Sequence, residues 1–209
     1  MEGQVYFLMK HEAATIIFII FLCLLVLIRS VYKLRYNHLI SIKAFHYEPL
    51  WLILIRYIFG LLLMAATIFR IFIPEYFISH YPVLPVWLQI AGMPIAFLSL
   101  ILLLASHQAL GDNFSTSIDT ERTHEIIMRG PYRFIRHPMY VAYLFFFAGL
   151  FLISRSLVFG ISGILIILSL MILRLPYEEK ALTEKYPDIY SEYKTRTGAF
   201  IPKIRHLPK

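Results

Sequence analysis

The stretch from Arg129 to Tyr140, RGPYRFIRHPMY, gathers several side chains that could do chemistry in an otherwise apolar chain. Arginines bind carboxylate or phosphate groups through a planar set of donors, and histidine and tyrosine can hold other polar groups. A simpler interpretation puts Gly130-Pro131 in a turn, the arginines among lipid headgroups and Pro138 at the first position of a helix. That interpretation does not explain why a histidine and two tyrosines lie within the same few residues.

Arg174 and Glu178 form a second candidate group, because side chains four residues apart share one face of a helix. As a simple ion pair they would contribute roughly 0.2–0.5 kcal/mol. If they line a cleft with His137 and Tyr140, they place an anion-binding arginine beside a carboxylate that can receive hydroxyls or a cation. No serine or cysteine has a recognisable base partner, and no phosphate-binding loop, dinucleotide motif or Cys/His metal-ligand spacing is present. We therefore predict neither a soluble nucleotide-binding fold nor a metal site.

Composition indicates where these side chains must be positioned. With 59% hydrophobic and 16% charged residues, the chain is predicted to be an integral membrane protein. A net charge of +7 could suggest a nucleic-acid partner, but the excess of Lys and Arg in cytoplasmic loops and the anionic lipid headgroups explain it more simply. We expect membrane lipids as partners and no nucleic acid.

Five apolar stretches approach the roughly 20 residues that a membrane-spanning helix needs. They are Ala13 to Ile28, Leu50 to Ile73, Val83 to Ser106, Pro138 to Ile153 and Leu157 to Leu173. The fold class predicted is therefore all-α integral membrane, with five transmembrane helices. Only Ser154, Arg155 and Ser156 separate the last two stretches, so these helices should form an antiparallel hairpin. We divide the chain into an N-terminal three-helix region, 1–106, and a catalytic region, 107–209.

Most of the 20 Lys and Arg residues fall on one side of this arrangement. The bias predicts a multi-pass protein with its N-terminus outside and its C-terminus in the cytosol, in the inner membrane of a prokaryote or the endoplasmic reticulum of a eukaryote. The Arg129 to Tyr140 stretch and the C-terminal tail then share the cytosolic face. In the tail, a helix over Pro176 to Tyr186 and a second one, capped by Asp188 and ending near Arg196, predict a cytosolic helical cap. The spacing of its tyrosines favours an amphipathic helix at the membrane interface.

The motifs together resemble one family. They are LGDNFS (Leu110 to Ser115), THEIIMRGPYRFIRHPMY (Thr123 to Tyr140), RLPYEE (Arg174 to Glu179), Tyr190 with Tyr193, and GAFIP (Gly198 to Pro202). In order and spacing they resemble the isoprenylcysteine carboxyl methyltransferase family, which is grouped with the membrane phospholipid methyltransferases. The resemblance covers roughly the C-terminal half, and the N-terminal helices are similar only in being apolar.

This resemblance implies a methyltransferase that uses S-adenosylmethionine. The positions it assigns to cofactor binding are His124, Glu125, Ile126, Ile127, Tyr132, His137, Pro138, Met139, Tyr140 and Glu178. Arg174 matches the position that faces the substrate, and we assign it the catalytic and substrate-binding role. Tyr143 departs from the family pattern, because many members carry a small residue in this region.

The acceptor predicted is the carboxylate of an isoprenylcysteine-type lipid, either a small molecule or a protein C-terminus. Because a carboxylate is ionised at neutral pH, with a pKa near 4, its methylation needs alignment rather than a base. Phospholipid N-methylation is the nearest alternative, although an amine must first lose a proton. A sterol-type reductase remains open but belongs to longer chains. A non-enzymatic scaffold or a transporter also remains, and transport predicts polar residues at mid-bilayer in several helices.

Overall fold

The computed structural model describes residues 11–36, 49–72, 84–113 and 125–203, and within these ranges every regular element is a helix. The long apolar helices are α1 (His11–Tyr36), α2 (Leu50–Phe72), α4 (Val86–Leu110), α5 (Pro138–Ser154) and α6 (Leu157–Leu173). Two 3-10 turns, η3 (Gly111–Asn113) and η4 (Gly130–Arg133), and the tail helices α7 (Leu175–Lys185) and α8 (Pro187–Arg196) complete the set. The prediction of an all-helical fold is confirmed.

Length and composition allow four of the described helical segments to cross a membrane, and α5 is a shorter apolar helix. The predicted positions of the five apolar helices agree with the structure, although α1 begins two residues before and ends eight residues after the predicted Ala13 to Ile28. The third helix also differs at both ends. It was expected over Val83 to Ser106, whereas α4 runs from Val86 to Leu110. The helix continues past Ser106 because His107 is completely buried and stacks on Tyr32 of α1, with ring centroids 4.7 Å apart.

The helices α4 and α5 cross closely. A Cβ atom on Gly92 would lie 2.7 Å from the carbonyl oxygen of Gly149, and one on Gly149 would lie 2.8 Å from the backbone nitrogen of Ala96. Two glycines therefore let the backbones touch. Around this crossing the core is apolar, and Phe146, Leu150 and others from α5 are almost fully buried.

The predicted hairpin of α5 and α6 is confirmed. Arg155 adopts a left-handed conformation (φ 54°) that ends α5, and the hydroxyl of Ser156 accepts a hydrogen bond from the Phe159 N–H at the start of α6. Gly163 then faces Phe147 of α5, where an added Cβ would lie 2.3 Å from the ring. The short connection and the small residue bring the two helices into direct contact.

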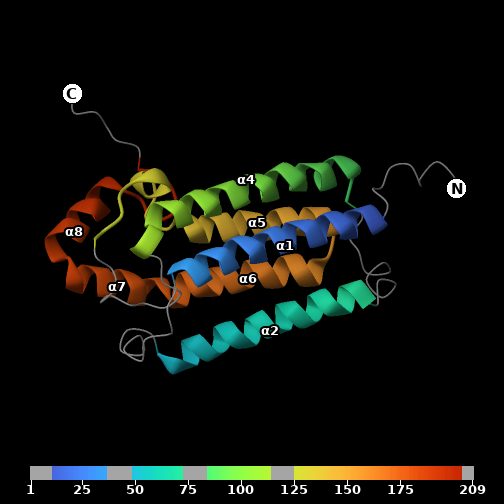
Figure 1. Ribbon diagram of the computed structural model, residues 1–209, viewed down its shortest axis with the longest axis horizontal. Coiled ribbons are helices and arrows are strands. Elements are labelled where there is room, and N and C mark those ends of the chain that lie inside the picture. Colours follow the sequence, from blue (N-terminus) through green and yellow to red (C-terminus); the bar gives the residue numbers. More distant parts are fainter. Residues whose placement is uncertain (1–10, 37–48, 73–83, 114–124, 204–209) are drawn as a thin grey trace, which may run out of the picture.

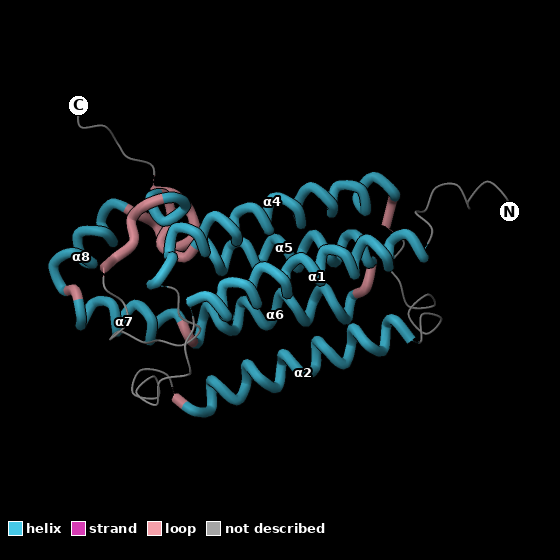
Figure 2. The backbone as a smooth tube through the Cα atoms, viewed as in Figure 1, coloured by secondary structure: helices cyan, strands magenta, loops and turns pink. Residues whose placement is uncertain are grey.

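Figure 1 shows α1, α4, α5 and α6 lying alongside one another, with α2 at the edge of the bundle next to α6. The tail helices α7 and α8 extend beyond one end of the bundle and turn back toward η4 (Figure 2). The polar segment 125–137 and the tail helices α7 and α8 therefore lie at the same end of the helix bundle.

Two tail predictions need correction. Asp188 does not cap α8, because the helix begins at Pro187 and Asp188 already lies in its first turn. Tyr190 and Tyr193 were expected at the membrane interface, but only 1% and 5% of their surfaces are exposed. They pack inward instead, against the residues that precede α5. The helical spacing correctly placed these tyrosines on one face of α8, but it could not show whether that face contacts the membrane or the protein.

Candidate functional site

The hydroxyl of Tyr140 joins two charged side chains at the start of α5. It donates a hydrogen bond to Oε2 of Glu178 (3.2 Å) and accepts one from Nη1 of Arg174 (3.3 Å). Tyr140 lies in the first turn of α5, whereas Arg174 and Glu178 lie where α6 passes into α7. The predicted grouping of Arg174, Glu178 and Tyr140 is therefore present. A phenol, a guanidinium and a carboxylate face one another across two helices.

His137 was expected to line the same cleft as Arg174 and Glu178, and its ring contacts the neighbouring carboxylate of Glu179. Its Nε2 lies 3.1 Å from Oε1 of Glu179, which also accepts a hydrogen bond from Nε of Arg136 at 3.0 Å. Oε2 of the same carboxylate lies 3.2 Å from Nζ of Lys194 on α8. Adjacent residues of a helix point about 100° apart, so Glu178 and Glu179 cannot serve the same partner. Glu179 collects three basic side chains instead.

Sequence reasoning missed Glu179, Arg136 and Lys194 as members of this site. The sequence did contain a signal for two of them: two adjacent acidic residues, Glu178-Glu179, could pair with two adjacent basic residues, Arg136-His137. Lys194 had no comparable signal. It reaches Glu179 only because α8 folds back over α7, which helical periodicity does not reveal.

The tail also pairs with the chain just before α5. The backbone N–H of Arg136 donates to the carbonyl of Gly198 (2.9 Å), and that of His137 donates to the carbonyl of Ala199 (3.0 Å). The guanidinium of Arg136 additionally donates to the carbonyl of Thr197. Gly198 is needed here, because an added Cβ would lie 1.8 Å from the carbonyl oxygen of Ile201. The expectation that the two polar regions meet is confirmed.

Tyr132 lies beneath this connection. Its carbonyl accepts a hydrogen bond from the hydroxyl of Tyr193 (2.6 Å), and its ring packs with Ala109 and Ile127. Burial, and then the nearby carboxylate of Glu178, raises the pKa of Tyr132 well above its ordinary value. Burial likewise raises the pKa of Tyr193 to about 12. Both phenols are therefore protonated at neutral pH, and that of Tyr193 acts as a hydrogen-bond donor.

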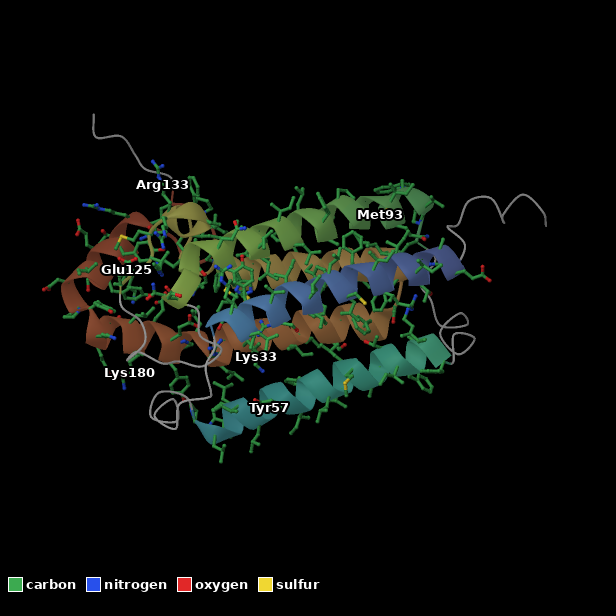
Figure 3. The ribbon with its side chains drawn as sticks, in the orientation of Figure 1. Lys33, Tyr57, Met93, Glu125, Arg133 and Lys180 are labelled. Carbon is green, nitrogen blue, oxygen red and sulfur yellow. The ribbon has the colours of Figure 1, made fainter. Side chains whose placement is uncertain are left out.

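The remaining predicted residues differ in their positions. Pro138 is fully buried, Met139 and Ile126 are partly buried, and Ile127 is 7% exposed. Glu125 is exposed, and Figure 3 shows it at the same end of the molecule as Arg133 and Lys180. His124 lies outside the described residues. The structure thus brings Tyr132, His137, Tyr140, Arg174 and Glu178 to one end, while Glu125 remains at the surface.

Chemically, the site combines carboxylates and phenols with the guanidinium groups of Arg136 and Arg174. Carboxylates and aromatic rings both stabilise a cationic ligand, and an arginine suits a carboxylate or phosphate group. Within the described ranges, no cluster of three or more His, Cys, Asp or Glu side chains is arranged to hold a metal ion. The arrangement could therefore hold a cation and an anion side by side.

Comparison with known proteins shows similarity to membrane methyltransferases. A family model described as phospholipid methyltransferase matches residues 87–189, which run from α4 into the start of α8. The human protein-S-isoprenylcysteine O-methyltransferase is 27% identical over 121 residues, covering 57% of this chain and 43% of that protein. Protein-S-isoprenylcysteine O-methyltransferase B of Arabidopsis thaliana is 25% identical over 120 residues, covering 56% of this chain and 61% of that protein. This chain thus matches less than two thirds of the length of either relative.

A solved structure shares the fold. The eukaryotic intramembrane Ras methyltransferase, an isoprenylcysteine carboxyl methyltransferase, superposes with a TM-score of 0.54 at 22% sequence identity. The match covers 71% of this chain and 52% of that one. At this identity the likeness establishes the helical membrane fold, and the side-chain roles must be argued from this chain alone.

Proposed function

We propose that this chain, which is similar to the isoprenylcysteine carboxyl methyltransferases, transfers a methyl group from S-adenosylmethionine to the carboxylate of an isoprenylcysteine-type lipid. One observation carries the proposal: Arg174 and Glu178 both contact the hydroxyl of Tyr140. The guanidinium of Arg174, which can bind an anion, and the carboxylate of Glu178, which can bind a cation, therefore share one hydroxyl group as a hydrogen-bond partner. Methyl transfer from a cationic donor to an anionic acceptor needs this juxtaposition.

The residues at the site fit such a cofactor. When bound, S-adenosylmethionine supplies an electrophilic methyl group on a sulfonium sulfur. The hydroxyl of Tyr190 is buried and has no hydrogen-bond partner among the described residues, so it can donate to a ligand. Burial, and then the carboxylate of Glu179, raises the pKa of Tyr190, which keeps that donor protonated. We propose that Glu178 binds the cofactor's ammonium or hydroxyl groups. The other cofactor contacts proposed are His124, Glu125, Ile126, Ile127, Tyr132, His137, Pro138, Met139 and Tyr140.

Arg174 would hold the acceptor. A guanidinium presents two parallel N–H groups to a carboxylate, a geometry that a lysine ammonium does not reproduce. Since a carboxylate is already ionised at neutral pH, its orientation is the main requirement. Correct orientation of two reacting groups contributes on the order of 7 kcal/mol or more to a rate. We assign Arg174 this catalytic role, with Tyr140 holding one of its amino groups.

The membrane arrangement follows from this assignment. The polar site lies at one end of an apolar bundle, so we propose that this end faces the cytosol and that the N-terminus lies outside. A water-soluble cofactor then enters from the cytosol and a lipid acceptor enters from within the bilayer. We further propose that residues 107–209 form the catalytic region and residues 1–106 a membrane region that supports it.

Labelled methyl transfer tests the proposed reaction. Purified protein in detergent is incubated with S-adenosylmethionine and either N-acetyl-S-farnesylcysteine or phosphatidylethanolamine. Base-labile label on farnesylcysteine is the expected result, because a methyl ester hydrolyses in base. Base-stable label on the phospholipid would instead identify an N-methyltransferase, the activity suggested by the description of the matching family model. Label on neither acceptor would contradict both assignments.

Arg174 variants test the acceptor assignment. We expect Arg174→Lys and Arg174→Ala to lose most turnover, because neither retains the paired N–H groups. The Kd for S-adenosylmethionine, measured by calorimetry, should change little in both. Full turnover in Arg174→Ala would remove this residue from the mechanism.

Glu178→Ala separately tests the cofactor assignment. Loss of a charge-assisted contact to a bound cation should raise the cofactor Kd by roughly 10- to 100-fold. Glu184→Ala, on the exposed face of the same helix, is the matched control and should leave the Kd unchanged. An unchanged Kd in Glu178→Ala would reject its role.

A further inference from the structure

One face of the start of α5 carries three polar residues at intervals of three: His137, Tyr140 and Tyr143. Residues three apart are neighbours on a helix surface. Each contacts a charged side chain from another helix. His137 contacts Glu179, Tyr140 contacts Glu178 and Arg174, and Tyr143 contacts Arg29 of α1. The row of polar contacts therefore continues past Tyr140 to Tyr143 and Arg29, which have no assigned role so far.

Arg29 is bound to Tyr143 in two ways. Its guanidinium donates a hydrogen bond to the Tyr143 hydroxyl, and its central carbon lies 5.5 Å from the centre of the Tyr143 ring. Arginines near the end of a membrane helix usually extend outward to the headgroups. Lys33, one turn further along α1, is exposed and fits that behaviour. Arg29 is half-buried and points inward across the helix interface instead.

The charge of Arg29 is not neutralised by an acid in the described part of the chain. Its contacts there are the hydroxyl and ring of Tyr143, and His107 of α4 lies within its electrostatic reach. Arg174, by contrast, shares the Tyr140 hydroxyl with the carboxylate of Glu178. A guanidinium has five N–H donors, and a partly buried one is costly without an anion. An anionic ligand would complete this position.

Tyr143 also lies close to the residues of the candidate site. It is three residues from Tyr140 on the same face of α5, and its phenol contributes to raising the pKa of Tyr132. Tyr132, Tyr140 and Tyr143 therefore surround one region from η4 and α5. An anion bound by Arg29 would therefore lie near Tyr143, about one helical turn further along α5 than Tyr140.

We propose that Arg29, held by Tyr143, binds the oxyanion of the lipid that occupies the site and so selects anionic acceptors. This inference deepens the proposed function and rests on it only for the identity of the lipid. The oxyanion can belong to the acceptor carboxylate or to the phosphate of a membrane lipid. In either case α1, which lies outside the matched residues 87–189, contributes a specificity-determining residue.

Binding without turnover tests Arg29 directly. Affinities of the detergent-solubilised protein are measured by calorimetry for two ligand pairs: N-acetyl-S-farnesylcysteine with its methyl ester, and phosphatidylglycerol with diacylglycerol. Wild type should prefer the anionic member of at least one pair. In Arg29→Gln this preference should fall by roughly 10- to 100-fold, the effect of losing a hydrogen bond between charged groups. The pair that loses its preference identifies carboxylate or phosphate as the ligand.

Three further variants control for folding and for general charge. Arg29→Lys retains the charge and should keep part of the preference, whereas Tyr143→Phe retains the ring, loses the anchoring hydroxyl and should reduce it. Lys33→Gln removes a positive charge from the same helix and should leave the preference unchanged. The Kd for S-adenosylmethionine reports whether each variant is folded.

The inference is overturned if Arg29→Gln keeps the preference of wild type, or if wild type shows none for either pair. A failure of methyl transfer to both acceptors would instead refute the proposed function. The two failures are distinguishable, because the binding preference is measured without turnover.

Discussion

The helices α5 and α2 are both strongly apolar, yet they occupy opposite extremes of packing. Along α5, Phe146, Leu150 and Ile153 are each at most 1% exposed. Along α2, Leu61 and Leu62 are each 59% exposed, and a Cβ added to Gly60 would meet nothing within 4 Å. Figure 1 shows the same contrast, with α5 between α4 and α6 and α2 at the edge. Hydropathy alone does not distinguish the helix that carries the site from one that faces its surroundings.

Two kinds of residue mark the difference. Where α5 meets α4, small residues permit backbone contact, and at its N-terminal end polar residues connect it to the tail through Glu178 and Glu179. On α2 the main polar connection described is near its C-terminal end, where Arg70 contacts Thr15 of α1 and the ring of Phe18. The comparison teaches that α5 is fixed at both its middle and its beginning. Disturbing either should cost more than any change on α2.

Removing the carboxylate of Glu179 should produce the largest effect on stability. Glu179→Gln leaves Arg136, His137 and Lys194 without their shared anion, and the Glu179 side chain is only 19% exposed. Loss of one member of a fully buried pair costs roughly 3–5 kcal/mol, so we expect about 2–3 kcal/mol at this partly exposed site. The thermal midpoint in detergent should fall, and the tail beyond Tyr186 should become sensitive to protease.

The control is Glu192→Gln on α8. Glu192 pairs with Arg196, but both side chains are about 60% exposed, and such pairs contribute roughly 0–1 kcal/mol. If Glu179→Gln and Glu192→Gln lowered the midpoint equally, Glu179 would not be holding the tail to α5.

Much of the fold follows from the sequence alone. Apolar length located the five helices, and three residues between two apolar stretches correctly indicated the α5–α6 hairpin. Hydrophobicity is a property of each segment, so it can be read without knowing its neighbours. The interior position of α5 depends on which helices meet, and composition does not contain that information.

The candidate site was predicted in part. Tyr140, Arg174 and Glu178 were grouped correctly because two of them share a helix face and the third belongs to the same set of motifs. The contact between His137 and Glu179 was not predicted, since choosing between Glu178 and Glu179 requires the rotation of α7 relative to α5. Arg29 was not identified because an arginine near the end of an apolar helix has the same sequence pattern whether it points outward or inward.

The close backbone contact between α4 and α5 predicts the next largest effect. In Gly149→Ala, the added methyl group would lie 2.8 Å from the carbonyl oxygen of Gly92, and neither backbone can move without displacing a helix. We expect a loss of about 1–3 kcal/mol, measured as a lower thermal midpoint. Gly60→Ala on α2 introduces the same methyl group into open space and should be neutral or stabilising by up to about 1 kcal/mol. Equal losses in the two variants would contradict the contrast between α5 and α2.

The smallest effect should come from one hydrogen bond of the tail. Tyr193→Phe removes the donor to the carbonyl of Tyr132 and should cost about 1 kcal/mol in thermal unfolding at neutral pH. Burial raises the pKa of Tyr193 from its ordinary 10 to about 12, so folding favours the protonated phenol. This contribution is therefore fully present below about pH 10 and is lost as the pH rises through about 12. The difference between wild type and Tyr193→Phe should stay constant between about pH 6 and 9. A difference that disappears within that range would show that the hydroxyl ionises too readily to hold the tail against η4.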